Sequence, residues 1–120
     1  MLIVEDNDTC AETLQIALES LPDLEVLSIG SPRAAIAILA DTGREIAAII
    51  TDLHLPQTDG LDLIRQLRAD PRFARLPILL ISGDSDPRLH ERALANGASA
   101  FFPKPYSPSA VRRKLEEFLC

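Results

Sequence analysis

Five short apolar runs alternate along the chain with segments whose apolar residues recur at helical spacing. Each run is almost continuously hydrophobic, which is typical of strands buried on both faces of a parallel sheet. A strand-then-helix order that repeats five times predicts one α/β unit with right-handed crossover connections. The predicted strands cover residues 1–5, 25–29, 46–51, 77–81 and 98–102.

Capping and helix-breaking residues mark the helices that connect these strands. A first helix is expected near residues 8–21 and a second near 32–41, with Ser31 as the N-cap of the second. The third is expected between Asp59-Gly60 and Asp70-Pro71, the fourth between Asp86-Pro87 and Asn96-Gly97, and the fifth after Ser107-Pro108. Because no repeat or linker interrupts the pattern, we expect a single domain over residues 1–120 and no output domain in this chain.

Composition narrows the classes of protein to which the chain can belong. With 120 residues and 47% hydrophobic content, one domain can bury a core without disulfides or a structural metal. A net charge of -6 argues against direct nucleic-acid binding by this domain, because neutralising phosphates requires clustered lysine and arginine. No apolar run reaches the roughly 18 residues that cross a bilayer, and the start lacks a basic signal-peptide region. We therefore expect a cytoplasmic protein without membrane insertion.

Charged and hydroxyl side chains stand at the carboxyl ends of four predicted strands. Glu5 and Asp6 end the first strand, Asp52 follows the third, Ser82 the fourth and Lys104 the fifth. The carboxyl ends of parallel strands lie side by side, so three carboxylates, a hydroxyl and an ammonium are expected to converge on one rim. Carboxylates gathered in this way repel one another and favour either a raised pKa or a bound divalent cation. The cluster therefore predicts Mg²⁺ chemistry at Asp52.

Sequence strings spread over nearly the whole chain carry a resemblance to a known family. They are Leu2 to Asn7, Thr51 to Pro56 with Asp59-Gly60, Ile81 to Gly83, Asn96 to Ala98, and Lys104-Pro105. In this order and spacing the chain resembles the receiver domain of two-component response regulators and hybrid histidine kinases. The resemblance implies a doubly wound, flavodoxin-like sheet with strand order 2-1-3-4-5 and five helices.

The resemblance also implies a phosphorelay function in which Asp52 accepts a phosphoryl group. The donor would be a histidine kinase or a histidine phosphotransfer protein, and the domain would assist its own phosphorylation and dephosphorylation without being an enzyme. Mg²⁺ would be bound directly by Asp6 and Asp52, mostly through water by Glu5, and by the backbone carbonyl of His54. Lys104 and Ser82 would contact the phosphoryl oxygens during transfer.

A switch at the partner surface is implied as well. Many receivers carry a tyrosine or another aromatic residue three positions before the lysine, and this chain has Phe101 there, so switching would depend on packing alone. The face formed by the fourth helix, fifth strand and fifth helix is expected to meet partners or a second copy of the domain. The side chain of His54 is expected at the rim of the site, where it would tune the phosphoryl lifetime. Pro103, which directly precedes Lys104, has no assigned role.

Three other classes of protein share parts of this pattern. One is a receiver-shaped interaction module that is never phosphorylated. Such a module would need neither the acidic pair Glu5-Asp6 nor Asp52, Ser82 and Lys104, all of which are present here. A haloacid-dehalogenase-type phosphatase requires a second carboxylate two residues after its nucleophile, where this chain has His54. A flavodoxin-like cofactor binder would carry a loop rich in glycine, serine and threonine after its first strand, which is absent from the sequence.

Overall fold

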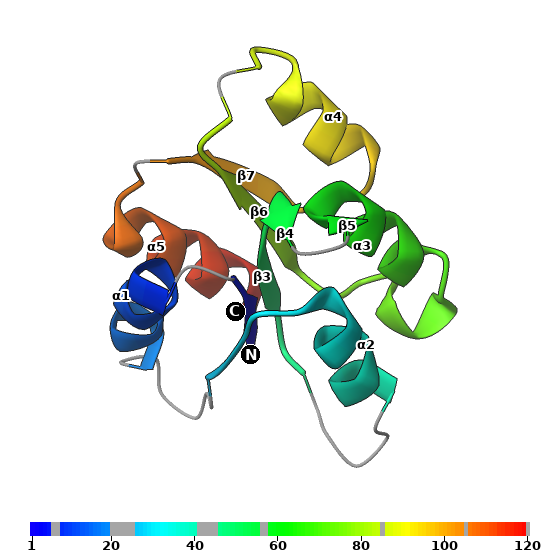
Figure 1. Ribbon diagram of the computed structural model, residues 1–120, viewed down its shortest axis with the longest axis horizontal. Coiled ribbons are helices and arrows are strands. Elements are labelled where there is room, and N and C mark those ends of the chain that lie inside the picture. Colours follow the sequence, from blue (N-terminus) through cyan, green and yellow to red (C-terminus); the bar gives the residue numbers. More distant parts are fainter. Residues whose placement is uncertain are drawn as a thin grey trace.

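The computed structural model describes residues 1–5, 8–19, 26–40, 46–55, 58–84, 86–104 and 106–119. Within these residues, five parallel strands form one sheet in the order β2-β1-β3-β6-β7 (Figure 1). Their bounds are Leu2–Val4 for β1, Leu27–Ile29 for β2, Ile49–Asp52 for β3, Ile78–Ser82 for β6 and Ala100–Pro103 for β7. Counting only these five strands, the order is 2-1-3-4-5, so the predicted fold class and strand order are confirmed.

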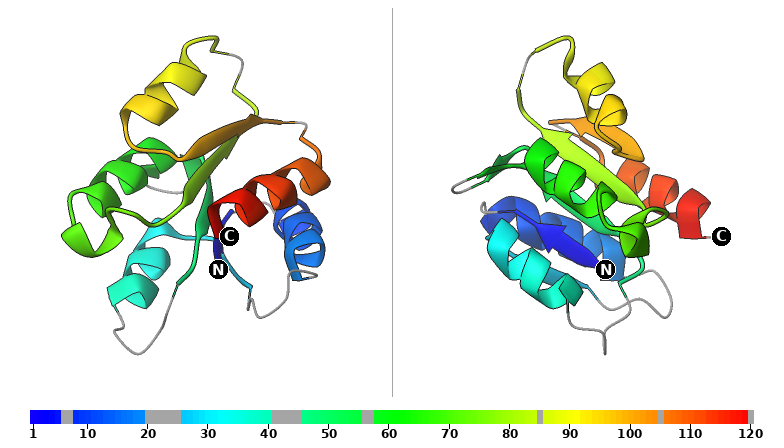
Figure 2. Two further views of the ribbon diagram at one scale, coloured as in Figure 1. Left: turned by 180° about the vertical axis from the view of Figure 1, so that it is seen from behind. Right: turned by 90° about the vertical axis from the view of Figure 1, so that its right-hand side faces the viewer.

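Helices cover both faces of this sheet (Figure 2). On one face, α2 (Pro32–Ala40), α3 (Gly60–Arg68) and α4 (Leu89–Ala95) enclose a hydrophobic core, and on the other α1 (Asp8–Glu19) and α5 (Pro108–Leu119) enclose a second. Successive strand residues point to opposite faces, so Ile78 and Leu80 enter the first core while Leu79 and Ile81 enter the second. This two-sided burial explains why the strands are continuous apolar runs.

Three of the predicted caps make the expected hydrogen bonds. The carboxylate of Asp59 accepts from the backbone N–H of Asp62 at 2.8 Å, and the Ser31 hydroxyl accepts from that of Ala34 at 3.3 Å. Ser107 caps α5 in the same way. Each cap satisfies an N–H group that the first helical turn leaves without an intrahelical partner.

The fourth helix starts later than the sequence predicts. It begins at Leu89, and its N-cap residue, Arg88, makes no capping bond through its side chain. Asp86 instead accepts from the N–H of Arg88 at 2.9 Å, so its carboxylate stabilises the preceding turn and not the helix itself. At the other end, Asn96 is the C-cap and Gly97 adopts a φ of 108°, as expected for a helix-terminating glycine.

Two short elements were not predicted from the sequence. A hairpin of β4 (His54–Leu55) and β5 (Thr58–Asp59) follows β3, and a 3₁₀ helix, Pro71–Phe73, follows α3. Both are too short to produce a recognisable hydrophobic period. The hairpin lies directly beside the carboxyl end of the central strand.

The side chain of Arg68 connects three segments at the opposite end of the sheet. Its guanidinium donates to the carbonyl of Gly97 at 2.9 Å, to that of Phe73 at 2.6 Å and to the Ser99 hydroxyl at 3.3 Å. Ser99 in turn accepts from the N–H of Ile78 at 3.1 Å. These bonds tie the end of α3 to the turn between α4 and β7, and burial lowers the pKa of Arg68.

Gly60 lets the start of α3 approach the central strand closely. Its N–H donates to the carbonyl of Leu53 at 2.7 Å, and a Cβ at position 60 would lie 2.3 Å from the carbonyl oxygen of Asp52. A methyl group cannot occupy that space unless the backbone moves. The backbone position of Asp52 therefore requires a residue without a Cβ at position 60.

We predict that Gly60→Ala lowers the free energy of unfolding by about 1–3 kcal/mol, because the added methyl group overpacks the backbone at Asp52. Urea unfolding measures this change as a shift of the midpoint. Gly83→Ala is the matched control, since a Cβ there would meet Lys104 at an ordinary 3.8 Å. Equal midpoints for the two variants would contradict the assigned close contact.

Candidate functional site

The carboxyl ends of the strands bring most of the predicted site residues to one rim. Glu5 directly follows β1, and Lys104 directly follows β7. Asp52 is the last residue of β3, and Ser82 is the last residue of β6. The parallel register pairs Val4 with Thr51, which places Glu5 level with Asp52. Asp6 lies outside the described residues.

A lysine bridges two buried carboxylates at the centre of the site. The Lys104 ammonium lies 2.8 Å from Oδ2 of Asp52 and 3.0 Å from Oε2 of Glu5. Glu5 and Asp52 are only 3% and 5% exposed. Such charges are tolerated away from water because they are paired and hydrogen-bonded.

The balance of burial and pairing decides the charge of Lys104. Burial by itself lowers the pKa of the ammonium, but the hydrogen bonds to Asp52 and Glu5 outweigh it and raise the pKa of Lys104 above its ordinary value. The pairing therefore stabilises the fold fully below the ordinary lysine pKa of about 10.4. The stabilisation is lost only as the pH rises through the raised value.

The second oxygen of the Asp52 carboxylate is held by the backbone. Oδ1 accepts from the N–H of His54 at 3.2 Å, while the Thr51 hydroxyl donates to the Asp52 carbonyl at 3.0 Å. Lys104 and the His54 amide thus contact different oxygens of one carboxylate. This arrangement fixes the orientation of Asp52 at the end of the strand.

The side chain of His54 reaches away from the carboxylate cluster. It is 69% exposed, and its Nε2 lies 3.5 Å from Oδ2 of Asp84, in the loop after β6. The imidazole therefore lies at the rim of the site, and the role predicted for the carbonyl of His54 stays a prediction. Asp84 was missed by the sequence analysis, although an aspartate two residues after a strand-ending serine is a recognisable turn signal.

Ser82 and Lys104 are joined through the backbone. The Ser82 carbonyl accepts from the Lys104 N–H at 2.7 Å, and the buried Ser82 hydroxyl accepts from the N–H of Asp84 at 3.0 Å. Pro103 is paired with Ser82 in the strand register, and in a parallel ladder the carbonyl of one residue accepts from the N–H that follows its partner, which here is that of Lys104. The missing N–H of Pro103 would point away from β6, so the edge strand tolerates this proline.

The donor chemistry of the site fits a hard divalent cation. Mg²⁺ prefers oxygen ligands and keeps several waters, so few carboxylates are needed to hold it. Glu5 and Asp52 supply such oxygens, and the position of Lys104 between them shows that a positive charge is accommodated there. Among the residues that the structure describes, no group of three His, Cys, Asp or Glu side chains is arranged around a metal position.

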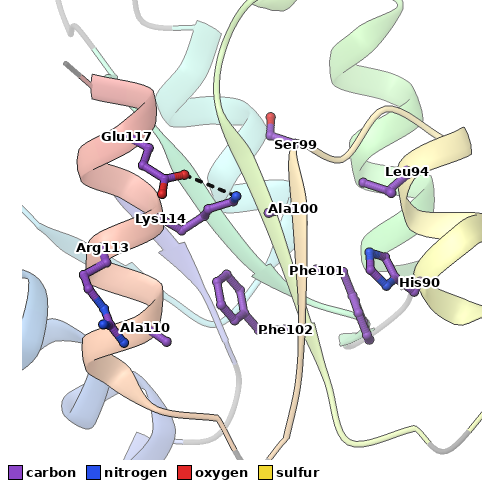
Figure 3. A pocket seen from close by; sticks show the side chains of 10 residues that line it. All are labelled: His90, Leu94, Ser99, Ala100, Phe101, Phe102, Ala110, Arg113, Lys114 and Glu117. Atoms are coloured by element: carbon purple, nitrogen blue, oxygen red, sulfur yellow. Dashed lines mark ion pairs between the residues drawn. The ribbon is translucent and has the colours of Figure 1, made fainter.

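Phe101 connects the site to the surface between α4 and α5. It lies on β7 opposite Leu80, so its strand is adjacent to the one that ends in Ser82, as the sequence predicted. Its ring faces α4, where its centroid is 5.6 Å from that of His90 at an interplanar angle of 31° (Figure 3). In this structure the ring is therefore half-buried and packs against the helix.

Comparisons with known proteins agree with this geometry. The family model for the response regulator receiver domain matches residues 1–116. The chain is 31% identical to chemotaxis protein CheY1 of Helicobacter pylori over 119 residues, covering 99% of this chain and 95% of that protein.

Solved structures of similar sequence share the whole fold. A putative response regulator from Chloroflexus aurantiacus superposes with a TM-score of 0.88 at 30% identity, covering 98% of this chain and 94% of that one. The signal receiver domain of a signal transduction histidine kinase from Syntrophus aciditrophicus gives a TM-score of 0.86 at 33% identity, covering 98% and 87%.

The chain therefore belongs to the response regulator receiver family and is a receiver domain of two-component signalling. Members of this family generally use Mg²⁺ and interact with histidine kinases. Across the described residues, no helix is long and apolar enough to cross a membrane.

We predict that Lys104→Met lowers the free energy of unfolding by about 2 kcal/mol without Mg²⁺, because two buried carboxylates lose their shared cation. Adding Mg²⁺ should stabilise this variant more than the wild type, since no ammonium competes for the carboxylate oxygens. Thermal unfolding with and without Mg²⁺ measures both effects.

Lys114→Met is the control for this prediction, because Lys114 pairs with Glu117 on the exposed face of α5. It should change neither the stability appreciably nor the response to Mg²⁺. A Lys104→Met protein as stable as the wild type without the cation would contradict the role given to the bridge.

Proposed function

We propose that Asp52 accepts a phosphoryl group from the phosphohistidine of a histidine kinase or a histidine phosphotransfer protein. The observation that carries this proposal is the Lys104 bridge, which holds a buried carboxylate and a cation in contact at a strand end. In the transfer, the phosphorus–nitrogen bond to the donor histidine breaks as an Asp52 oxygen forms the new bond to phosphorus. The product is an aspartyl phosphate on this chain.

Charge balance supports a phosphoryl-transfer role. The sequence places Asp6 beside Glu5 and Asp52, so three carboxylates are expected in the site, of which the structure describes two. A bound Mg²⁺ would supply two positive charges, and Lys104 adds a third, which brings the site close to neutral. A site of this kind can accept a phosphoryl group without a large electrostatic penalty.

The residues of this chain act by position and charge. The His54 amide and Lys104 orient the two oxygens of Asp52 before the reaction. As charge develops on the phosphoryl oxygens, the Lys104 ammonium stabilises it, and the Ser82 hydroxyl donates a hydrogen bond to one of these oxygens. We propose that Glu5, Asp6, Asp52 and the carbonyl of His54 hold the Mg²⁺, and that the same site assists hydrolysis of the phosphoryl group.

The output surface that we propose is the face formed by α4, β7 and α5, which would bind a partner or a second copy. Phe101 supports this, because its ring lies on β7 and packs on His90 of α4. Inward rotation of the ring after phosphorylation would remove one side of that surface. We further propose that residues 1–120 form a single receiver domain. It would act in the cytoplasm, where its histidine kinase partner would phosphorylate it.

We predict that Asp52→Asn folds normally and gains no phosphoryl mass, because an amide of similar shape is a poor nucleophile. The wild type should gain one phosphoryl group when it is incubated with a small phosphodonor such as acetyl phosphate, and only when Mg²⁺ is present. Intact-protein mass spectrometry measures the increment.

Asp70→Asn serves as the control, since Asp70 pairs with Arg72 outside the site. It should be phosphorylated like the wild type. Phosphorylation of Asp52→Asn at the wild-type level would overturn the assignment, whereas repeated release of phosphate without a stable adduct would favour a phosphatase.

We also predict that Ser82→Ala is still phosphorylated but responds less to the phosphoryl group. Moving a population from 1:99 to 99:1 takes about 5.5 kcal/mol, while one hydrogen bond to a charged group supplies about 1.5–3 kcal/mol. Amide chemical shifts near Phe101 and α4, recorded with and without beryllium fluoride as a phosphoryl mimic, measure the response.

The control for this variant is Ser109→Ala, at an exposed position of α5. Its shifts should change as fully as those of the wild type. Undiminished changes around Phe101 in Ser82→Ala would exclude the coupling through the hydroxyl.

A further inference from the structure

An imidazole on α4 covers the outer side of the Phe101 ring. The ring centroids of His90 and Phe101 lie 5.6 Å apart at an interplanar angle of 31°, and the close-up of this region shows the two rings side by side (Figure 3). Their separation lies within the range in which aromatic pairs attract each other beyond the effect of burial alone. The outward position of Phe101 is therefore stabilised by a specific contact.

The rest of α4 does not depend on His90. Leu89 and Ala93 are the residues of this helix that are buried in the core, whereas His90 is exposed. Among the described residues, the imidazole forms no hydrogen bond and no ion pair. Other side chains therefore hold the helix on the sheet, and the contact with Phe101 is the specific interaction that His90 contributes.

The inner side of Phe101 leads to Ser82. The register pairs Phe101 with Leu80 of β6, and Ser82 follows two residues later on the same face of that strand. Phe101 packs against the same hydrophobic core as Leu80, so the two side chains share this face of the sheet. Rotation of the ring towards β6 would bring it nearer to Ser82 and separate it from His90. The two neighbours of the ring are therefore alternatives.

We propose that His90 is a positioning residue that restrains Phe101 in the outward position and so opposes the switch. The inference rests on the proposed inward rotation of Phe101 after phosphorylation, and it names the contact that this rotation must break. In the phosphorylated domain, the bond from Ser82 to the phosphoryl group favours the inward ring, while His90 favours the outward ring. His90 thereby sets how much of the unphosphorylated domain already has an inward ring.

Replacing His90 tests the restraint in the unphosphorylated domain. His90→Ala should raise the ratio of inward to outward Phe101 rings about three- to tenfold, the range expected for the loss of one aromatic pair. His90→Tyr keeps an aromatic face at this position and should restore the wild-type ratio. NOE cross-peaks between the Phe101 ring protons and the β protons of Ser82 measure the inward population without a phosphodonor or a metal.

Glu91→Ala is the matched control, because Glu91 is exposed on the same helix but does not line the pocket around Phe101. It should leave the cross-peaks unchanged. Alanine is the best helix former, so both alanine variants are expected to fold. Wild-type cross-peaks in His90→Ala would overturn the restraint, and so would a His90→Tyr or Glu91→Ala protein that behaves like His90→Ala.

Thermodynamic linkage supplies a second measurement at the phosphorylation site. A ligand that favours the inward state binds more tightly when that state is more populated. Beryllium fluoride with Mg²⁺, used as the phosphoryl mimic at Asp52, should therefore bind to His90→Ala more tightly than to the wild type, by about the factor found for the ring. His90→Tyr and Glu91→Ala should keep the wild-type affinity. An unchanged affinity in His90→Ala would overturn the coupling of His90 to the site.

The two measurements separate this inference from the proposed function. If the wild type gains no phosphoryl mass, the assignment of Asp52 fails, but the NOE cross-peaks of the metal-free domain still decide whether His90 restrains the ring. If the wild type is phosphorylated and the cross-peaks do not change in His90→Ala, the restraint fails while the role of Asp52 stands.

Discussion

The bridge from Lys104 to Glu5 and Asp52 is the interaction on which the site depends. The two carboxylates are almost completely buried and would repel each other without a cation between them. They come from neighbouring central strands, whereas the lysine comes from the loop after the edge strand. One ion-pair cluster therefore links β1, β3 and β7 across the intervening strand β6.

The backbone around this cluster restricts its geometry. Gly60 allows α3 to start against the carbonyl of Asp52, because it has no Cβ to fill that space. The Lys104 N–H donates to the Ser82 carbonyl, which fixes the lysine backbone beside the end of β6.

Strand β7 is the physical link between the site and the partner surface that we propose. At its carboxyl end, the Lys104 amide bonds to Ser82, and within it Phe101 packs against His90 of α4. A displacement at Ser82 can therefore reach Phe101 and α4 through one short strand. The distant end of α4 is held by the bonds of Arg68 to Gly97 and Ser99, so the two ends of this helix are restrained differently.

The sequence by itself determined the sheet, the number and order of the helices along the chain, and the rim where charged residues meet. These follow from hydrophobic period and from position, because a residue that ends a parallel strand must lie at the carboxyl edge. The resemblance to receivers added the strand order, which periodicity alone does not specify. The short β4–β5 hairpin and the later start of α4 escaped prediction because they carry no periodic signal.

Only the tertiary structure decided which atoms meet. The sequence placed His54 near the site, but the fold directs its side chain outward to Asp84 while its amide contacts Asp52. Arg68 and Gly60 acquire their roles from contacts with segments outside their own helix. The pocket lined by His90, Phe101 and Lys114 likewise forms only because α4 and α5 are packed on opposite faces of the sheet. Local patterns specify elements and faces, whereas contacts between remote side chains depend on how those elements are placed in space.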